Sequence, residues 1–176
     1  PATLPDGYGR LLADLKERIR DARTRASVSV NRKLVLLYWE IGRCILNRQR
    51  EEGWGARVID RLSADVRATF PGIKGFSARN LKRMKAFYCA YGGGNEIVPQ
   101  PVAQLERLIL PNPIACLPWG HNIVLLEKVK EPAQRLWYAR QAIEHGWSRA
   151  VLVHQIESGL SQRQGRAVTN VERTLP

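Results

Sequence analysis

Residues 56–91 read ARVIDRLSADVRATFPGIKGFSARNLKRMKAFYCAY, and this stretch decides the expected fold. Its apolar residues recur every three or four positions on both sides of Pro71-Gly72, as they do on one face of an amphipathic helix. Proline followed by glycine favours a turn, and Ser77 is a typical N-cap for a second helix. The stretch therefore predicts a helix over about 56–70, a turn, and a helix over about 78–91, which is the outline of a helix-turn-helix.

The same helical spacing extends over most of the chain. It predicts a helix on the apolar residues between Leu11 and Ala22 and a long helix over 28–50 that ends at Gly53. Two more helices are expected after Pro132 and after Ser148. Because no convincing alternating strand pattern occurs, the expected fold is all-α, a helical bundle that contains the helix-turn-helix-like unit at about 55–91.

The composition changes between residues 92 and 118, where three consecutive glycines and five prolines occur. This stretch is predicted to be a Gly/Pro-rich linker or insertion with a short helix over about 102–110. The expected organisation is N-terminal helices over 1–91, C-terminal helices over 119–165 and a tail over 166–176. Two helical subdomains and one continuous bundle are both consistent with this pattern.

Three tryptophans are each expected to lie just before a helix. A tryptophan there can pack on the fourth helical residue as a hydrophobic staple, which predicts an architectural role rather than base stacking. The three expected sets of tryptophan, N-cap and fourth residue are Trp54, Gly55 and Ile59; Trp119, Gly120 and Val124; and Trp147, Ser148 and Leu152.

The chain is strongly basic, with 28 Lys+Arg against 16 Asp+Glu among 176 residues and a net charge of +12. Arginine supplies 21 of these cations, and its planar guanidinium suits phosphate. From Val66 to Asn95 there is no acidic residue at all. In the earlier basic stretch from Arg18 to Lys33, Glu17 and Asp21 are interleaved with the arginines, so ion pairs within the helix are expected there.

A helical wheel of residues 78–91 separates two faces. The apolar side chains from Leu81 to Tyr91 share one arc, whereas Arg79, Lys82 and Arg83 lie opposite them beside the small Ala86. A basic helix with a free N-terminus is what a groove-inserted helix needs. The candidate nucleic-acid-binding residues are therefore Arg67, Lys74, Ser77, Arg79, Lys82, Arg83 and Lys85.

Several other classes are not supported. No apolar run approaches the roughly 20 residues of a membrane span, and three distant cysteines fit a reducing cytoplasm better than a disulfide framework. Cys44 is expected to fill the core. The three histidines lack metal-ligand spacing, and neither a phosphate loop nor a nucleophile elbow occurs. We therefore expect no catalytic residue, no metal, no cofactor and no small-molecule substrate in this chain.

Several strings resemble the N-terminal domain of the bacterial YhcG-type family over roughly residues 8–175. They are LYWEIG at 37–42, GWGA at 53–56, FPG at 70–72, GFSARNL at 75–81, LPWGHN at 117–122, WYA at 137–139, GWSR at 146–149 and QIESGL at 155–160. One departure is the stretch from Glu106 to Cys116, which is an expected insertion relative to the family pattern. The resemblance implies a helical domain that precedes a nuclease-like domain of the PD-(D/E)xK type, for which Mg²⁺ would be the cofactor. That domain would lie beyond Pro176.

Together these observations predict a non-catalytic DNA-binding or targeting module of a nuclease-related protein. RNA is an alternative partner, because a basic helix does not specify which backbone it meets. The rival hypothesis is a protein-interaction or oligomerisation module, including a homodimer. In that case apolar surface from Leu108 to Leu117, or the helix over 28–50, would contact another chain.

Overall fold

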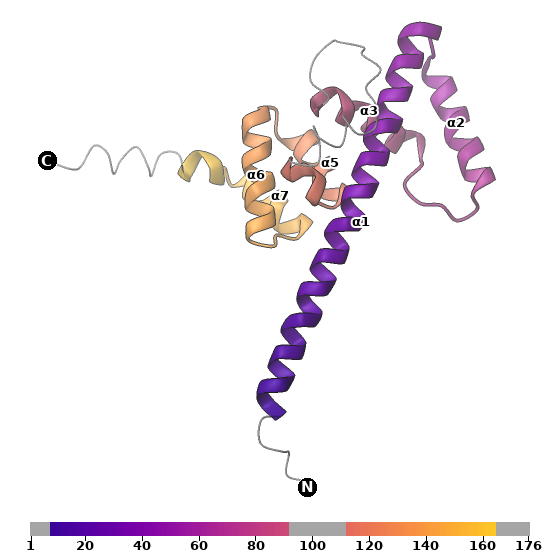
Figure 1. The fold of residues 1–176 in the computed structure, drawn as a ribbon. Helices are drawn as coiled ribbons and strands as arrows, with labels where there is room; N and C mark the ends of the chain where they lie inside the picture. Colours follow the sequence, from indigo (N-terminus) through magenta and orange to yellow (C-terminus); the bar gives the residue numbers. More distant parts are fainter. Residues whose placement is uncertain (1–7, 92–111, 165–176) are drawn as a thin grey trace, which may run out of the picture.

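The computed structural model describes residues 8–91 and 112–164, and within these residues the chain is all-α, as predicted (Figure 1). The short helix expected over 102–110 and the C-terminal tail lie outside the described residues. The elements are α1 (Tyr8–Glu52), α2 (Ala56–Thr69), α3 (Ala78–Tyr91), the 3-10 helix η1 (Pro113–Cys116), α5 (Trp119–Lys128), α6 (Pro132–Glu144) and α7 (Arg149–Glu157).

Helix α1 is a single 45-residue helix where the apolar pattern predicts two. Neither proline nor glycine interrupts residues 10–41, so nothing in this stretch breaks the helix, which is roughly 67 Å long at 1.5 Å per residue. It ends as predicted before Gly53, whose φ of 67° is the left-handed conformation typical of a residue that terminates a helix. The N-terminal end of α1 projects away from the other helices (Figure 1), whereas Arg23, Thr24 and Ser27 already line a pocket with residues of η1, α5 and α6.

The larger core joins α1 and α3 to the C-terminal helices. Val35 and Trp39 of α1 and Phe87 of α3 pack in one cluster with residues from every later helix, including Leu125, Tyr138 and Leu152. This burial stabilises the contact of α1 and α3 with the C-terminal helices.

Residues 112–118 differ from the expectation of a linker. Ile114 and Ala115 of η1 are fully buried in the larger core, and Leu117 is 4% exposed. The buried Asn122 of α5 donates from Nδ2 to the carbonyl oxygen of Ile114 at 2.9 Å, which fixes η1 against α5. The expected apolar interaction surface runs from Leu108 to Leu117. Its described part, residues 112–117, belongs to the core instead, because these side chains pack on α1 and α6.

Helices α1, α2 and α3 share a second, smaller core. Tyr38 and Ile45 of α1 pack there with Ile59 of α2 and with Leu81 and Met84 of α3. Helix α3 is thus the central element of the N-terminal helices, with α1 along one side.

Two of the three expected helix starts are confirmed. Gly55 is the N-cap of α2, and Ser148 caps α7 by accepting a hydrogen bond from the backbone N–H of Val151 at 3.3 Å. The third expectation is wrong, because α5 begins at Trp119 itself, with Pro118 as its N-cap rather than Gly120.

Trp119 instead lies between the two cores. Its ring makes edge contacts with Tyr38 of α1 at 4.8 Å and with Phe87 of α3 at 5.2 Å between ring centroids. Such contacts stabilise a core beyond the area that they bury. Trp119 therefore joins three helices. Its role is architectural, but it is not the predicted hydrophobic staple.

No helix in the described part of the chain is both long enough and apolar enough to cross a membrane.

Candidate nucleic-acid interface

The predicted two-helix unit consists of α2, a connection over residues 70–77, and α3. At eight residues the connection is longer than the three or four residues of a typical helix-turn-helix turn. It is held on both sides: the Ser63 hydroxyl of α2 donates to the carbonyl oxygen of Phe76 at 2.8 Å, and the Phe76 ring makes an edge contact with Tyr38 of α1. The connection is therefore a fixed part of the fold.

Gly75 brings this connection close to α1. Its φ of 90° is a conformation that residues with a side chain rarely adopt, and a Cβ there would lie 2.5 Å from the Tyr38 hydroxyl oxygen. The same packing raises the pKa of the Tyr38 phenol by burial. The neighbouring Lys74 is exposed. Because Gly75 packs on Tyr38, the connection holds the Lys74 side chain toward solvent.

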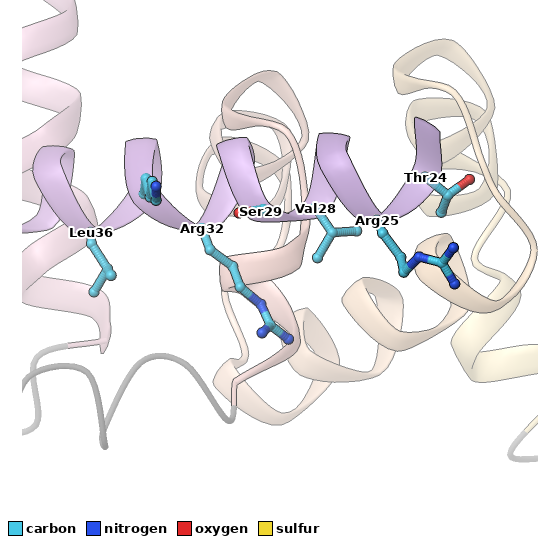
Figure 2. A pocket seen from close by; sticks show the side chains of 7 residues that line it. Thr24, Arg25, Val28, Ser29, Arg32 and Leu36 are labelled. Atoms are coloured by element: carbon cyan, nitrogen blue, oxygen red, sulfur yellow. The ribbon is translucent and has the colours of Figure 1, made fainter. Parts of the chain in front are cut away.

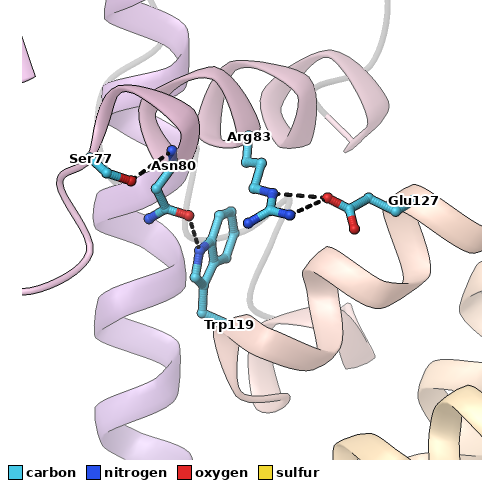
Figure 3. Close-up of polar contacts among 5 residues, drawn as sticks. All are labelled: Ser77, Asn80, Arg83, Trp119 and Glu127. Carbon is cyan, nitrogen blue, oxygen red and sulfur yellow. Dashed lines mark hydrogen bonds and ion pairs between the residues drawn. The ribbon is translucent and has the colours of Figure 1, made fainter. Parts of the chain in front are cut away.

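Ser77 caps α3, as predicted. Its Oγ accepts a hydrogen bond from the backbone N–H of Asn80 at 3.3 Å (Figure 3). The buried Asn80 side chain links this end of α3 to two other parts of the fold. Its Nδ2 donates to the carbonyl oxygen of Gly75, and its Oδ1 accepts from the Trp119 indole N–H at 2.9 Å. The N-terminus of α3 is thus anchored to both the turn and α5.

The two faces of α3 agree with the helical wheel. Leu81, Met84 and Phe87 are at most 1% exposed and face the cores, whereas Arg79 and Lys82 are exposed on the other side. Helix α3 can pack this closely because Gly42 of α1 has no side chain at the crossing. A Cβ on Gly42 would lie 2.1 Å from the carbonyl oxygen of Met84.

Arg83 does not belong to the free basic face, which corrects the prediction for this residue. Its Nε and Nη2 lie 2.9 and 2.5 Å from Oε1 of Glu127 on α5, and its side chain is 26% exposed (Figure 3). Arg83 lies at the border between the basic and the apolar faces of α3, where α5 packs. A helical wheel gives the direction of a side chain but cannot reveal an acid 44 residues away.

Lys85 is also occupied. Its Nζ donates to Oε1 of Gln49 on α1 at 2.9 Å, and the residue is half-buried. This contact turns Lys85 toward α1, so its predicted position on a phosphate is not supported by its placement.

Four of the six predicted cations are exposed, and none of the four forms an ion pair with another residue in the described ranges 8–91 and 112–164. They come from the end of α2, the connection and the first half of α3. They are Arg67, Lys74, Arg79 and Lys82, and we call them the basic surface.

A second group of cations lies on α1 and was not among the predicted site residues. Arg25 and Arg32 point to the same side of the helix as Val28 and Leu36, where they line a shallow cavity of about 490 Å³ (Figure 2). Sequence reasoning assigned this stretch to ion pairs with Glu17 and Asp21. Neither acid takes part in an ion pair within the described residues, where Asp14 pairs with Arg18 at 3.0 Å instead. The signal that could have revealed the group is the seven-residue spacing of the two arginines.

The histidine and cysteine side chains are the other candidates for a catalytic or metal-binding role. His121 is buried, and its Nε2 lies 2.8 Å from the carbonyl oxygen of Trp147, which ties α5 to the start of α7. Cys44 is exposed, which corrects the prediction that it fills the core. It lines an apolar groove of about 460 Å³ between α1, α2 and α3. Among the described residues no group of three or more His, Cys, Asp or Glu side chains is placed to hold a metal ion.

Comparison with known proteins found one family and one relative that match most of the chain. The chain is 28% identical over 177 aligned positions to a protein of Escherichia coli (strain K12) named "Putative nuclease YhcG". The match covers 89% of this chain but 46% of that relative, so the chain spans less than half of the relative's length. No solved structure matches. Residues 14–163, which include every described helix in whole or in part, match the family described as the DUF1016 N-terminal domain. The chain therefore belongs to the DUF1016 N-terminal domain family.

Proposed function

We propose that this chain is a non-catalytic DNA-binding module that targets a nuclease-related protein to its substrate. The observation that carries the proposal is the basic surface: four exposed cations that form no ion pair with a described residue, on two helices and a connection that hydrogen bonds fix in the fold. Neutralising phosphates and releasing their counterions supplies most of the non-specific affinity of proteins for DNA. The net charge of +12 adds long-range attraction to the same partner.

The role of each cation follows from its position. Arg79 and Lys82 lie one turn apart on the exposed face of α3, so both can reach the same duplex. Lys74 in the connection and Arg67 near the end of α2 extend the contact to flanking phosphates. The Ser77 hydroxyl caps α3, so its contribution is to hold the helix end rather than to bind directly. Arg83 and Lys85 hold α3 in place and are not assigned to DNA.

Under this proposal the nuclease activity resides in another part of the full protein and not in this chain. The relative is named a nuclease, and this chain aligns with less than half of it. A catalytic domain with Mg²⁺ would therefore lie elsewhere in the full protein, which would act in the cytoplasm. RNA is the competing ligand, and it is compared directly in the test below.

The test is the salt dependence of binding to a fluorescent duplex. Each phosphate contact contributes about −0.9 to the slope of log K against log salt. Replacing both Arg79→Ala and Lys82→Ala should weaken binding and make the slope less steep by up to about 1.8. A matched variant, Lys130→Ala with Arg140→Ala, removes two exposed cations elsewhere and should leave the slope unchanged.

Two further outcomes decide the assignment. Identical slopes for the two double variants would show that only the net charge matters and would contradict the basic surface as the site. Tighter binding to an RNA duplex than to DNA of the same sequence at the same salt concentration would contradict the DNA assignment.

A further inference from the structure

The N-terminal arm of α1, residues 8–27, carries an apolar face of exposed side chains, and within the described chain only Arg23, Thr24 and Ser27 on another side of the arm line a pocket with η1, α5 and α6. Its large apolar side chains are exposed by 37% to 57%. Most of the stability of a protein helix comes from packing its apolar face against another element. A long free helix with such a face therefore suits docking to a partner. The exposed side chains are Tyr8, Leu11, Leu12, Leu15 and Ile19.

The spacing of this face identifies the kind of partner. The residues Tyr8, Leu12, Leu15, Ile19, Ala22 and Ala26 are separated alternately by four and three positions, which is the a/d pattern of a coiled coil over nearly three heptads. We call these six residues the seam. Its two alanines allow a second helix to approach closely, and Leu11 lies beside it at a g position. A membrane-surface helix typically presents a wider apolar face with large aromatic residues, so the seam favours a protein helix over a bilayer.

The charges beside the seam have one sign. Lys16 and Arg23 occupy e positions on one side of it, and Arg18 and Arg25 occupy g positions on the other. The three acids of the arm, Asp14, Glu17 and Asp21, lie on the opposite face of the helix at c and f positions. Asp14 pairs with Arg18, yet the Arg18 side chain is still 75% exposed.

This distribution of charges disfavours a second copy of the arm as the helix that binds the seam. In a parallel pair each g residue faces an e residue of the other helix, so Arg18 would face Arg23. In an antiparallel pair g faces g and e faces e, which again brings cations together. Like charges across a coiled-coil interface disfavour pairing, whereas acids at the partner's e and g positions would satisfy the cations.

We propose that residues 8–27 are a docking helix for an acidic amphipathic helix of a partner protein, with which they form a two-stranded coiled coil. The partner helix has apolar a and d positions and Glu or Asp at its e and g positions. The surface is separate from the basic surface on α3, so the partner and DNA can bind at the same time.

The probe is a synthetic peptide of four heptads with Ile at a, Leu at d and Glu at e and g. A second peptide has Lys at e and g and is otherwise identical. By fluorescence anisotropy the whole chain should bind the Glu peptide about tenfold or more tightly than the Lys peptide. Raising the salt concentration from about 50 to 500 mM should reduce this preference, because it shortens the screening length.

Two arm variants and one control separate the contributions. Leu15→Ser with Ile19→Ser should weaken binding of the Glu peptide about tenfold or more without changing Tm, because both side chains are exposed in the free chain. Charge reversal at the four flanking cations (K16E, R18E, R23E and R25E) should invert the preference so that the Lys peptide binds more tightly. Asp21→Asn on the opposite face should not weaken binding of the Glu peptide.

Three results would overturn the proposal. Equal affinity for the two peptides, or no binding of either, would remove the charge argument. A dimer of the chain in sedimentation equilibrium that the Leu15→Ser/Ile19→Ser variant abolishes would identify a second copy as the occupant. Flotation with vesicles rich in anionic lipid that the same variant abolishes would identify a membrane. Duplex binding by this variant should be unchanged, which keeps the test independent of the proposed function.

Discussion

At Gly42, α1 packs against the backbone of α3 so closely that a side chain there would overlap the Met84 carbonyl group. The neighbouring residues Tyr38 and Ile45 are buried in the smaller core, so neither helix can move away without opening that core. The obstacle is backbone, which yields less readily than the end of a flexible side chain.

The substitution Gly42→Ala should therefore lower the free energy of unfolding by about 1–3 kcal/mol, the range of an overpacked core. A suitable control is Gly120→Ala in α5, where the nearest atom to the new Cβ is Cδ of the flexible Arg149 at 3.4 Å. That control should be neutral or stabilising by up to about 1 kcal/mol, because alanine is the better helix former. Urea denaturation measures both, and equal stability of the two variants would show that the crossing adjusts freely.

Single residues also mark the limit of what the sequence predicts about the site. The identity of Ser77 as a cap follows from local rules, since its partner is three residues away. The role of Asn80 does not, because its acceptor oxygen binds the indole of Trp119, 39 residues further along the chain. An asparagine on a basic helix gives no local sign that it is buried.

At the scale of helices, α3 is clamped between α1 and α5. Gly42 and the smaller core hold one side of α3, and the Arg83–Glu127 ion pair and the Asn80–Trp119 hydrogen bond hold the other. This arrangement explains why only part of the basic face of α3 is free. The clamp orients Arg79 and Lys82 toward solvent at the expense of Arg83.

The Arg83–Glu127 pair should make a small, measurable contribution. A double-mutant cycle with Arg83→Ala, Glu127→Ala and both should give a coupling free energy of at most about 1 kcal/mol that decreases with added salt, because both side chains are partly exposed. Removing Glu127 alone should also leave Arg83 free to bind phosphate, so Glu127→Ala should strengthen duplex binding at low salt. Weaker duplex binding by Glu127→Ala would show that the pair orients the binding surface rather than withholding a cation from it.

Periodicity predicted the elements well because it reflects burial of one face. It located α2, α3, α6 and α7 and separated the two faces of α3. It failed for α1, where a change in the direction of the apolar face between the arm and the body resembled two helices. Prolines made η1 resemble a linker, although its short apolar residues fill the core between α1 and α6.

For the whole molecule, much of the excess positive charge lies on two separate surfaces. The basic surface on α2, the connection and α3 lies in a stretch without acids from Val66 to Tyr91, and the arm of α1 has acids on one face and cations beside its apolar seam. One protein can thus contact a polyanion with its body and a protein helix with its arm. The overall charge of +12 follows from composition, but which of the cations are exposed on these two surfaces required the fold.

The most direct test of the central claim is a titration of the ¹⁵N-labelled chain with a short DNA duplex, followed by the backbone amide signals. We expect the largest chemical-shift changes at residues 67–82, in the connection and the first half of α3, and small changes along the seam of the arm and in α6 and α7. If the largest changes instead lie in the arm or in α6 and α7 while residues 67–82 do not shift, the basic surface is not where this protein meets DNA.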